Sequence, residues 1–392
     1  MVRTKIFLLP ILCSLIFAQS CVHGDLDECP PMVRYAVAFE YTHHARTSNL
    51  SNGKDRFYDD VKKINLFVFD NNNLIYTTDT KIGPYDSNFN IPLDLPMGNY
   101  HIIAWGNVLA LTDTLNTLAT PEFVISPENF PKGTSLSQAR LTLERGVNSM
   151  SQKDFENLFY GESKITIPLY VSRIDTIPLI NDSKNVRVVL HWEHAGLDGP
   201  ITYNDVEVHL HGTNAVYNFL NTPETTTPVT YLPYKPFGKG ASLHADTWTN
   251  VIPALMTPTD NRTLMDTTVY DFRVLRMIPG HLLKLCVYRH NVITPTDNLL
   301  ATLGTPERSD PNYGIDIVGS ISADRGFSYF MRSSNGLSLT TQAQMQSAYD
   351  MYDNYQVDIH LLYDRFSNTY IAQNINILDW LRIQGNYPGW AN

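Results

Sequence analysis

The run VKKINLFVFD at residues 61–70 constrains the fold of this chain more than any other stretch. Side chains of a β-strand point alternately to opposite faces, so residues two apart share a face. Both faces of this run are apolar: one carries Ile64, Leu66 and Val68, and the other carries Phe67 and Phe69. Because neither face is suited to water, the run predicts a central strand of a β-sandwich.

The rest of the chain has the same character in shorter pieces. Runs rich in Tyr, Phe, Thr, Ile and Val alternate with clusters of Asn, Asp, Gly and Pro, and only 17% of the residues are charged. This pattern is typical of an all-β protein with many turns. It predicts a hairpin partner for the first run at 74–82, and further strands at 32–41, 89–95, 100–106, 164–171, 184–193, 205–211, 229–232, 267–277, 282–288, 298–303, 355–363 and 368–380.

A polar turn at 181–183 separates the expected strands into two groups. We therefore predict two tandem β-sandwich domains, an N-terminal one at 32–182 and a C-terminal one at 183–392. Short helical turns are expected at 138–143 and 153–158.

The C-terminal domain is expected to contain one longer helix, at 340–352. Met345, Ala348, Tyr349 and Tyr352 fall at helical spacing there and give the helix one apolar face.

Residues 1–20 have the layout of a secretory signal peptide. Arg3 and Lys5 form a basic start, and an apolar segment follows at 6–17. That segment is shorter than the roughly 20 residues that span a bilayer. Loss of the two basic residues takes the formal net charge from -10 to -12. An acidic chain without basic runs argues against nucleic-acid binding.

Cys21 follows Ala18, Gln19 and Ser20, which place small residues at positions −1 and −3. The arrangement resembles a bacterial lipoprotein processing site, in which cleavage after Ser20 leaves Cys21 as the lipid-modified first residue of a linker at 21–31. Gln19 and Ala18 depart from the commonest residues of such sites. Ordinary signal cleavage, which would leave Cys21 as a thiol, is the alternative.

Two cysteines remain, Cys29 and Cys286. Outside the cytoplasm they could form a disulfide. Cys286 lies in the apolar run HLLKLCVY, so a buried thiol on a strand is the alternative.

The sequence contains no phosphate-binding loop, nucleophile elbow or zinc-protease motif, so we expect neither an enzyme nor a cofactor. His209 and His211 are two apart on one strand face and would need a third ligand to hold a metal; surface strand residues are the alternative. His191 and Glu193 could imitate a base and its orienting partner, but no nucleophile accompanies them.

Aromatic side chains leave a carbohydrate-binding interpretation open. On the surface of a sandwich, Tyr231, Tyr234 and Trp248 could stack on sugar rings. Packing in the core and cover for sheet edges are the alternatives.

Several short motifs occur in an order and spacing that resembles one known family. They are DLDECP at 25–30, LFVFD at 66–70, AWGN at 104–107, LFYG at 158–161, KNVRV at 184–188, FRVLR at 272–276 and NILDW at 376–380. On these motifs the chain resembles, from about residue 21 to 380, the FimB-type fimbrial anchor family, the Mfa-like minor fimbrillin subunits. An irregular stretch at 223–260 and the loose form of the last motif depart from the family pattern.

The resemblance implies two transthyretin-like β-sandwich domains and a surface-exposed lipoprotein of the outer membrane at the base of a fimbria. Its implied partners are fimbrillin subunits. The expected function is to tether the fimbria and limit its length. A surface lipoprotein that binds glycan or a host ligand, or a tip or minor fimbrillin adhesin, is the alternative.

The family that this chain resembles polymerises by strand exchange, which is a form of β-augmentation. An arginine-specific protease removes the first strand of a stalk subunit, and the C-terminal strand of the next subunit fills the groove. Here Arg46 lies in a long polar loop after the first expected strand and is a candidate protease-sensitive position. Cutting there would leave the lipid held by noncovalent contacts alone, so we expect the loop to stay uncut in function.

The chain would then join the polymer through its last strand, at 368–380, or through a nearby edge. The candidate donor residues of that strand are Ile371, Ile375, Ile377 and Trp380.

Overall fold

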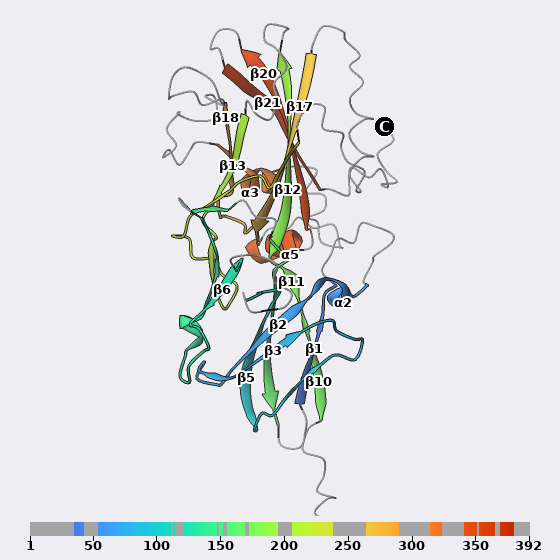
Figure 1. The fold of residues 1–392 in the computed structure, drawn as a ribbon, viewed down its shortest axis with the longest axis vertical. Helices are drawn as coiled ribbons and strands as arrows, with labels where there is room; N and C mark the ends of the chain where they lie inside the picture. Colours follow the sequence, from blue (N-terminus) through green and yellow to red (C-terminus); the bar gives the residue numbers. More distant parts are fainter. Residues whose placement is uncertain are drawn as a thin grey trace, which may run out of the picture.

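β-Strands form five sheets in the part of the chain that the computed structural model describes (Figure 1). The described residues are 35–42, 54–110, 113, 121–146, 149–151, 155–168, 172–194, 206–237, 264–289, 314–323, 341–350, 353–364 and 369–379. The predicted all-β class with two tandem sandwiches is confirmed, and the two halves follow one another along the long axis of the molecule.

Three sheets belong mainly to the N-terminal half. Sheet A consists of β10 (Arg173–Pro178), β1 (Tyr35–Glu40) and β4 (Ile91–Leu93), in that order. Sheet B consists of β11 (Ile180–Asn181), β9 (Phe159–Ile167), β5 (Gly98–Gly106), β2 (Lys63–Phe69) and β3 (Ile75–Ile82). Sheet D consists of β14 (Val216–Asn218), β7 (Arg140–Leu143) and β6 (Phe123–Ser126).

Strand β2 confirms the two-faced pattern of its sequence. Ile64, Leu66 and Val68 lie in the apolar core between sheets A and B. Phe67 and Phe69, on the opposite face, lie in a second and larger core that includes sheet D. Sheet B is therefore the middle layer of three, and water is excluded from both faces of its strand β2.

The turn between β2 and β3 closes the predicted hairpin. Asp70 accepts hydrogen bonds through Oδ1 from the backbone N–H groups of Asn72 (2.8 Å) and Leu74 (2.9 Å). Asn73 has a positive φ of 56°, which asparagine tolerates better than most residues. The register then runs antiparallel from Phe69 opposite Ile75 to Lys63 opposite Ile82.

The C-terminal half is a sandwich of two five-stranded sheets. Sheet F consists of β16 (Lys235–Phe237), β17 (Leu264–Leu275), β12 (Ser183–His194), β20 (Asn354–Asp364) and β21 (Thr369–Asp379). Sheet E consists of β19 (Ile315–Asp316), β18 (Lys284–Arg289), β13 (Val206–Gly212), β15 (Val229–Tyr231) and β8 (Met150–Ser151). The core side of β12 presents alternate residues Val186, Val188, Leu190 and Trp192.

The predicted helix is confirmed as α5 (Gln342–Asp350). Tyr349 on its apolar face is fully buried, and its hydroxyl donates to the carbonyl of Val318 (3.1 Å). The sequence did not predict α3 (Ile317–Ala323), which continues from β19, or the single turn α2 (Phe57–Asp60).

Some local predictions were wrong. Residues 138–143 are mostly strand β7, with a short 3-10 turn, η2 (Leu136–Gln138), before it. Residues 155–158 have no regular structure, so the second helical turn is not found there. Strand β9 begins at Phe159 and passes through Gly161, where a Cβ would lie 2.7 Å from the side chain of Leu179. The strand predicted at 298–303 lies outside the described residues.

The two halves interlock. Strand β14 pairs with β7, and β15 pairs with β8, so in each pair one strand precedes the predicted boundary at 182–183 and the other follows it. Phe219, just after β14, contacts the rings of Phe67 (4.9 Å between centroids) and Trp105 (6.1 Å) in sheet B. A shared apolar core favours motion of the two halves as one body; the domain boundary itself stays a prediction.

Candidate functional site

Strand β1 occupies the centre of sheet A. It runs parallel to β10 and antiparallel to β4, so both of its edges are paired. Tyr35, Val37 and Phe39 on its inner face are 4%, 0% and 3% exposed. The strand is thus a structural part of the first sandwich rather than a strand laid on its surface.

Both ends of β1 are fixed by tyrosine hydroxyl groups. At the start, Tyr35 donates to Asp175 Oδ2 of β10 (2.9 Å). Just beyond the end, Tyr41 donates to Asp353 Oδ2 (2.6 Å), which precedes β20 in the C-terminal half. Burial raises the pKa of the Tyr41 hydroxyl well above its usual value and the charge of Asp353 adds to this, so the hydroxyl stays protonated and remains a donor.

The backbone after β1 is held as well. The N–H of Tyr41 donates to Asp55 Oδ1 (2.8 Å), and the N–H of Arg56 donates to the carbonyl of Tyr41 (3.0 Å). These bonds bring together residues 41 and 55–56, which flank the loop that contains Arg46. Arg46 itself lies outside the described residues.

Asp353 belongs to a buried cluster of charges where the two halves meet, which we name the junction cluster. Its charged members are Asp182, Lys184, Arg276, Asp350 and Asp353. Lys184 is 0% exposed, and its Nζ donates to Asp353 Oδ1 (3.4 Å) and to the carbonyl of Asp350 (3.5 Å).

Arg276 connects β17 to helix α5 through a two-pronged ion pair. Its Nε donates to Asp350 Oδ1 (2.7 Å), and its second amino group donates to Asp350 Oδ2 (2.5 Å). Gln346 Nε2 also donates to Asp350 Oδ1 (2.8 Å). The cluster thereby ties together β1, β12, β17, α5 and the start of β20.

Few features of the sequence point to this cluster. Lys184 and Arg276 are the terminal charged residues of the KNVRV and FRVLR motifs, at the ends of apolar strands. A charge that adjoins a buried strand is the only local signal. The partners cannot be read from it, because Tyr41 and Asp353 are 312 positions apart.

Strand β21, near the C-terminus, is paired differently from β1. Within the described ranges β21 pairs with β20 alone and ends the strand order of sheet F. Its backbone places Ile371, Ile375 and Ile377 opposite Leu362, Ile359 and Val357. Trp380 lies outside the described residues. Asp379 stands opposite Tyr355, so β21 returns toward the junction cluster.

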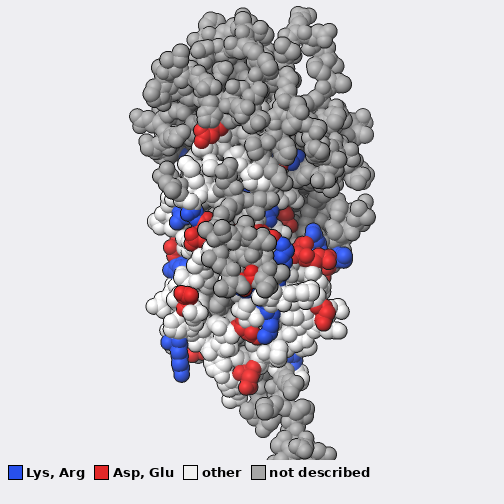
Figure 2. Space-filling view, in the orientation of Figure 1, with Lys and Arg blue, Asp and Glu red and all other residues white. Residues whose placement is uncertain are grey.

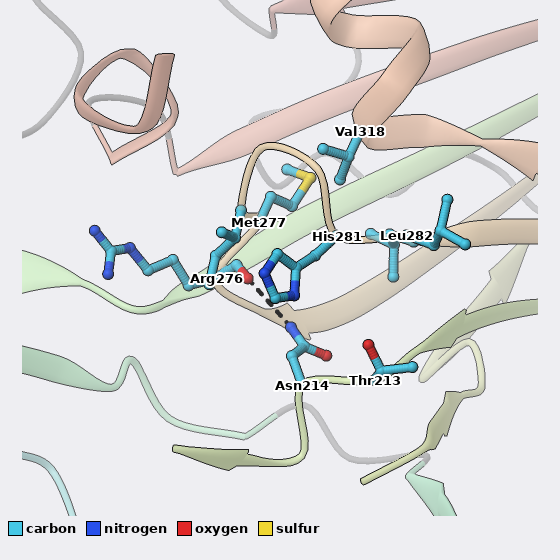
Figure 3. Close-up of a pocket in the computed structure, with 9 residues that line it drawn as sticks. Thr213, Asn214, Arg276, Met277, His281, Leu282 and Val318 are labelled. Atoms are coloured by element: carbon cyan, nitrogen blue, oxygen red, sulfur yellow. Dashed lines mark hydrogen bonds between the residues drawn. The ribbon is translucent and has the colours of Figure 1, made fainter. Parts of the chain in front are cut away.

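The cavity next to the junction cluster is too small for a ligand. It lies between Asn214, Arg276, His281 and Val318, and the amide of Asn214 points to the backbone carbonyl of Arg276 (3.1 Å; Figure 3). The centre of a water molecule can move through only about 10 Å³ of it. That is room for about one water.

Two larger grooves flank the turn between β2 and β3 and open to the surface. One, of about 590 Å³, lies beside β3 and is lined by residues that include Tyr76, Phe130 and Lys132. The other, of about 510 Å³, is lined by residues that include Asn71, Asn99 and His101. Asp70 borders both grooves.

Charged side chains of both signs intermingle on the face of the molecule shown in Figure 2. Among the described residues of this face, the distribution resembles an ordinary solvated surface, without the basic stripe of a nucleic-acid-binding face.

The histidines singled out in the sequence have local partners. His209 Nε2 lies 2.5 Å from Glu207 Oε1, and His211 Nδ1 lies 3.0 Å from Thr230 Oγ1. Among the described residues, no group of three potential ligands surrounds them or any other position. The ring of His191 stacks on His360 with centroids 4.5 Å apart.

The other predicted site residues divide into three groups. Cys286 lies on β18 opposite His209 and is 3% exposed, as expected for a buried thiol on a strand. Tyr231 is fully buried and its hydroxyl donates to Asn214 Oδ1 (2.9 Å), so it packs in the core, and the sugar-stacking interpretation does not hold for it. Ser20, Cys21, Cys29 and Trp248 lie outside the described residues.

None of the helices in the described ranges has the length and apolar character needed to cross a bilayer.

Three solved structures of Porphyromonas and Bacteroides proteins have a similar fold. The fimbrial anchor protein Mfa2 of Porphyromonas gingivalis is 16% identical, with a TM-score of 0.57 over 88% of this chain and 98% of that one. A Bacteroides thetaiotaomicron protein proposed to bind polysaccharide is 18% identical, with a TM-score of 0.61 over 88% of this chain and 96% of that one. A proposed adhesin of the same species is 18% identical, with a TM-score of 0.59 over the same shares.

No curated protein sequence matches the chain. A family model does: that of the fimbrillin-A associated anchor proteins Mfa1 and Mfa2 matches residues 26–383. The match covers most of the chain, from the linker behind Cys21 to beyond β21. The chain therefore belongs to the family of fimbrillin-A associated anchor proteins.

Proposed function

We propose that this protein is a lipid-anchored outer-membrane subunit that tethers a fimbria to the cell surface and ends the polymer at its base. The observation that carries the proposal is the placement of β1. Cys21 precedes Tyr35 by 14 residues, a linker that reaches at most about 45 Å. The next segment of the chain is a strand fixed in the middle of a sheet, so a lipid on Cys21 would be connected directly to the folded body.

The same placement argues against exchange of the first strand. In strand exchange, a subunit accepts its neighbour in the slot that its own first strand has left. Here β1 fills that slot: its inner face is buried, and a tyrosine hydroxyl group forms a hydrogen bond at each end of the strand. A subunit whose slot is filled cannot accept a further strand there, so it would end a polymer rather than extend it.

Strand β21 is the element best placed to contact the polymer. A strand at the edge of a sheet presents unpaired backbone groups along one side, and these groups can bind an extended segment or move with their strand into a partner. With Cys21 at the front and β21 at the end, the chain would attach to the membrane at one terminus and to fimbrillin subunits near the other.

Truncation of the last strand tests the polymer contact. Deletion of residues 368–392 removes β21, and deletion of 381–392, which keeps everything through Trp380, is the matched control. We expect cells with the longer deletion to lose surface-retained fimbriae while the subunit is still lipidated and protease-resistant, and cells with the control deletion to keep them. Normal fimbriae with the longer deletion would contradict the proposal.

Mass spectrometry of the intact mature protein tests whether Cys21 is the lipid-modified first residue. We expect a mass that begins at Cys21 and carries acyl chains; the same measurement reports whether Cys29 and Cys286 are linked. In a Cys21→Ser variant, fimbriae should be shed into the medium. Fimbriae that stay attached in that variant would place the anchoring elsewhere.

Carbohydrate binding is a second candidate function, favoured by the grooves beside the β2–β3 turn. One groove is lined by the carboxylate of Asp70 and by Tyr76, which is 47% exposed. The other is lined by Asp70 and by the amides of Asn71 and Asn99. Polar groups next to an aromatic ring suit a sugar. Titration of the purified protein with oligosaccharides should give binding that Tyr76→Ala abolishes; no heat of binding from any oligosaccharide would remove this candidate.

A further inference from the structure

The junction cluster holds one more negative group than positive groups. Three carboxyl groups, those of Asp182, Asp350 and Asp353, surround the two cations Lys184 and Arg276. Asp182 and Lys184 are both 0% exposed. An unbalanced charge is costly in such a place, because little water is available to solvate it.

The hydrogen bonds show which carboxyl group receives no hydrogen bond from a cation. Asp350 receives both prongs of Arg276, and Asp353 receives Lys184 and the hydroxyl of Tyr41. The nearest nitrogen of Arg276 lies 3.7 Å from Asp182 Oδ1, beyond a good hydrogen bond. The one side-chain donor recorded for Asp182 is the amide of Asn221, which bonds Oδ1 at 3.1 Å.

The remaining oxygens of these two side chains lack partners. Asp182 Oδ2 and Asn221 Oδ1 are both buried and have no hydrogen-bond partner among the described residues. Both are acceptors when Asp182 is ionised, and buried acceptors are rarely left unsatisfied. A single proton on Oδ2 would give the pair the donor that it lacks.

We propose that Asp182 and Asn221 form a carboxylic acid–amide pair, in which Asp182 Oδ2 holds a proton and donates it to Asn221 Oδ1. The amide already donates from Nδ2 to Asp182 Oδ1, so the pair would be joined by two hydrogen bonds. Release of the proton to solvent would leave a carboxylate beside Asp350 and break one of the two bonds. The proton would thus stabilise the junction between the two halves.

The surroundings of Asp182 favour the neutral form. Burial raises the pKa of Asp182 from 3.8 to about 7, and the charge of Asp350 on α5 also raises it. Arg276 at the end of β17, the Asn221 hydrogen bond and Lys184 on β12 lower it, and they do not overcome the burial. Tyr160 of β9 and Tyr217 of β14 also face Asp182, and burial raises the pKa of each hydroxyl, so both stay neutral.

The sign of the pH dependence follows from these values. Between about pH 4 and pH 7 the folded chain keeps a proton that the unfolded chain has lost. Stability supplied by the acid form is therefore present at low pH and is lost as the pH rises through about 7. The factor is at most tenfold in the folding equilibrium constant for each pH unit.

Asp182→Asn tests the pair, because an asparagine amide is neutral, has the shape of the protonated acid and, like it, places a donor beside an acceptor oxygen. Denaturant unfolding of purified wild type and variant should be compared from pH 5 to pH 8. We expect the ratio of folding constants, variant over wild type, to rise about tenfold per pH unit up to about pH 6.5 and to level off above pH 7. Asp271→Asn is the matched control: it removes a buried carboxylate that receives two hydrogen bonds from Arg187 outside the junction cluster, and it should weaken folding by a similar factor at every pH.

A variant-to-wild-type ratio that does not change with pH would overturn the proposal. Infrared spectroscopy of the wild type gives a second measurement that does not depend on the variant folding. A protonated carboxyl group has a carbonyl stretch distinct from that of a carboxylate, and one such band should disappear as the pH rises through about 7. Absence of that band at pH 5.5 would also overturn it. Neither result bears on whether the chain anchors a fimbria.

Discussion

Strands β1 and β21 lie near opposite ends of the chain and have opposite settings in their sheets. Strand β1 has a partner on each side and a buried inner face, and tyrosine hydroxyl groups fix both of its ends. Strand β21 pairs with β20 alone in the described part of the chain. Under the proposed function, the first strand stays in its own subunit, and the last strand is the one that contacts other subunits.

The largest loss of stability should come from truncating a buried side chain of β1. Phe39 is 3% exposed and stacks on Phe57 with centroids 5.6 Å apart, so Phe39→Ala should lower the free energy of unfolding by about 3–5 kcal/mol. Glu40→Ala, at the partly exposed next position, should change it by about 0.5 kcal/mol or less. Denaturant titration measures both. A small effect of Phe39→Ala would mean that β1 contributes little to stability and can leave its place in sheet A.

The next effect concerns the cation that links β1 to the C-terminal half. Lys184→Met leaves Asp353 without its buried counter-ion and should lower the free energy of unfolding by about 3 kcal/mol. Lys164→Met, at an exposed position on β9, is the control and should have little effect. If the two variants are equally stable in thermal or denaturant unfolding, the junction cluster does not secure the first strand.

The smallest effect should come from Tyr41→Phe, which removes one hydroxyl and no apolar contact. The lost bond is to a carboxylate, so the expected decrease is about 1.5–2 kcal/mol. Hydrogen exchange should then quicken in β1 and leave β21 unchanged. Faster exchange confined to β21 would reverse the comparison between the two strands.

Apolar periodicity predicted the regular parts of the fold well. The faces of β2, the hairpin with β3, the strands at β5 and β12 and helix α5 all follow from spacing within a single run. Strand β10 was missed because it is short, mostly exposed and ends in Pro178, and its main partner β1 lies far away in sequence. Strand β8 has two residues and forms only by pairing with β15, so it carries no pattern of its own.

The candidate site was less accessible from the sequence. Local patterns report which face of a strand is buried, and they do not report which distant charge meets it. Lys63 is a small example. A lysine on a strand is expected to lie at the surface, yet Lys63 is buried against Asp113, with 2.6 Å between Nζ and Oδ2. The junction cluster combines five chain segments, so its existence depends on the completed topology.

The insertion of Phe219 into the first half has a consequence for how the chain folds. Its ring covers Phe67 and Trp105 of sheet B, and it follows Phe67 by 152 residues in the sequence. Contacts of such long range form slowly, because a large loop must close before they contribute. Until the second half has been made, this face of sheet B would be covered only in part, by residues of the first half such as Phe130. We therefore expect one late, cooperative folding transition for the whole chain, and a need for a holding chaperone before it.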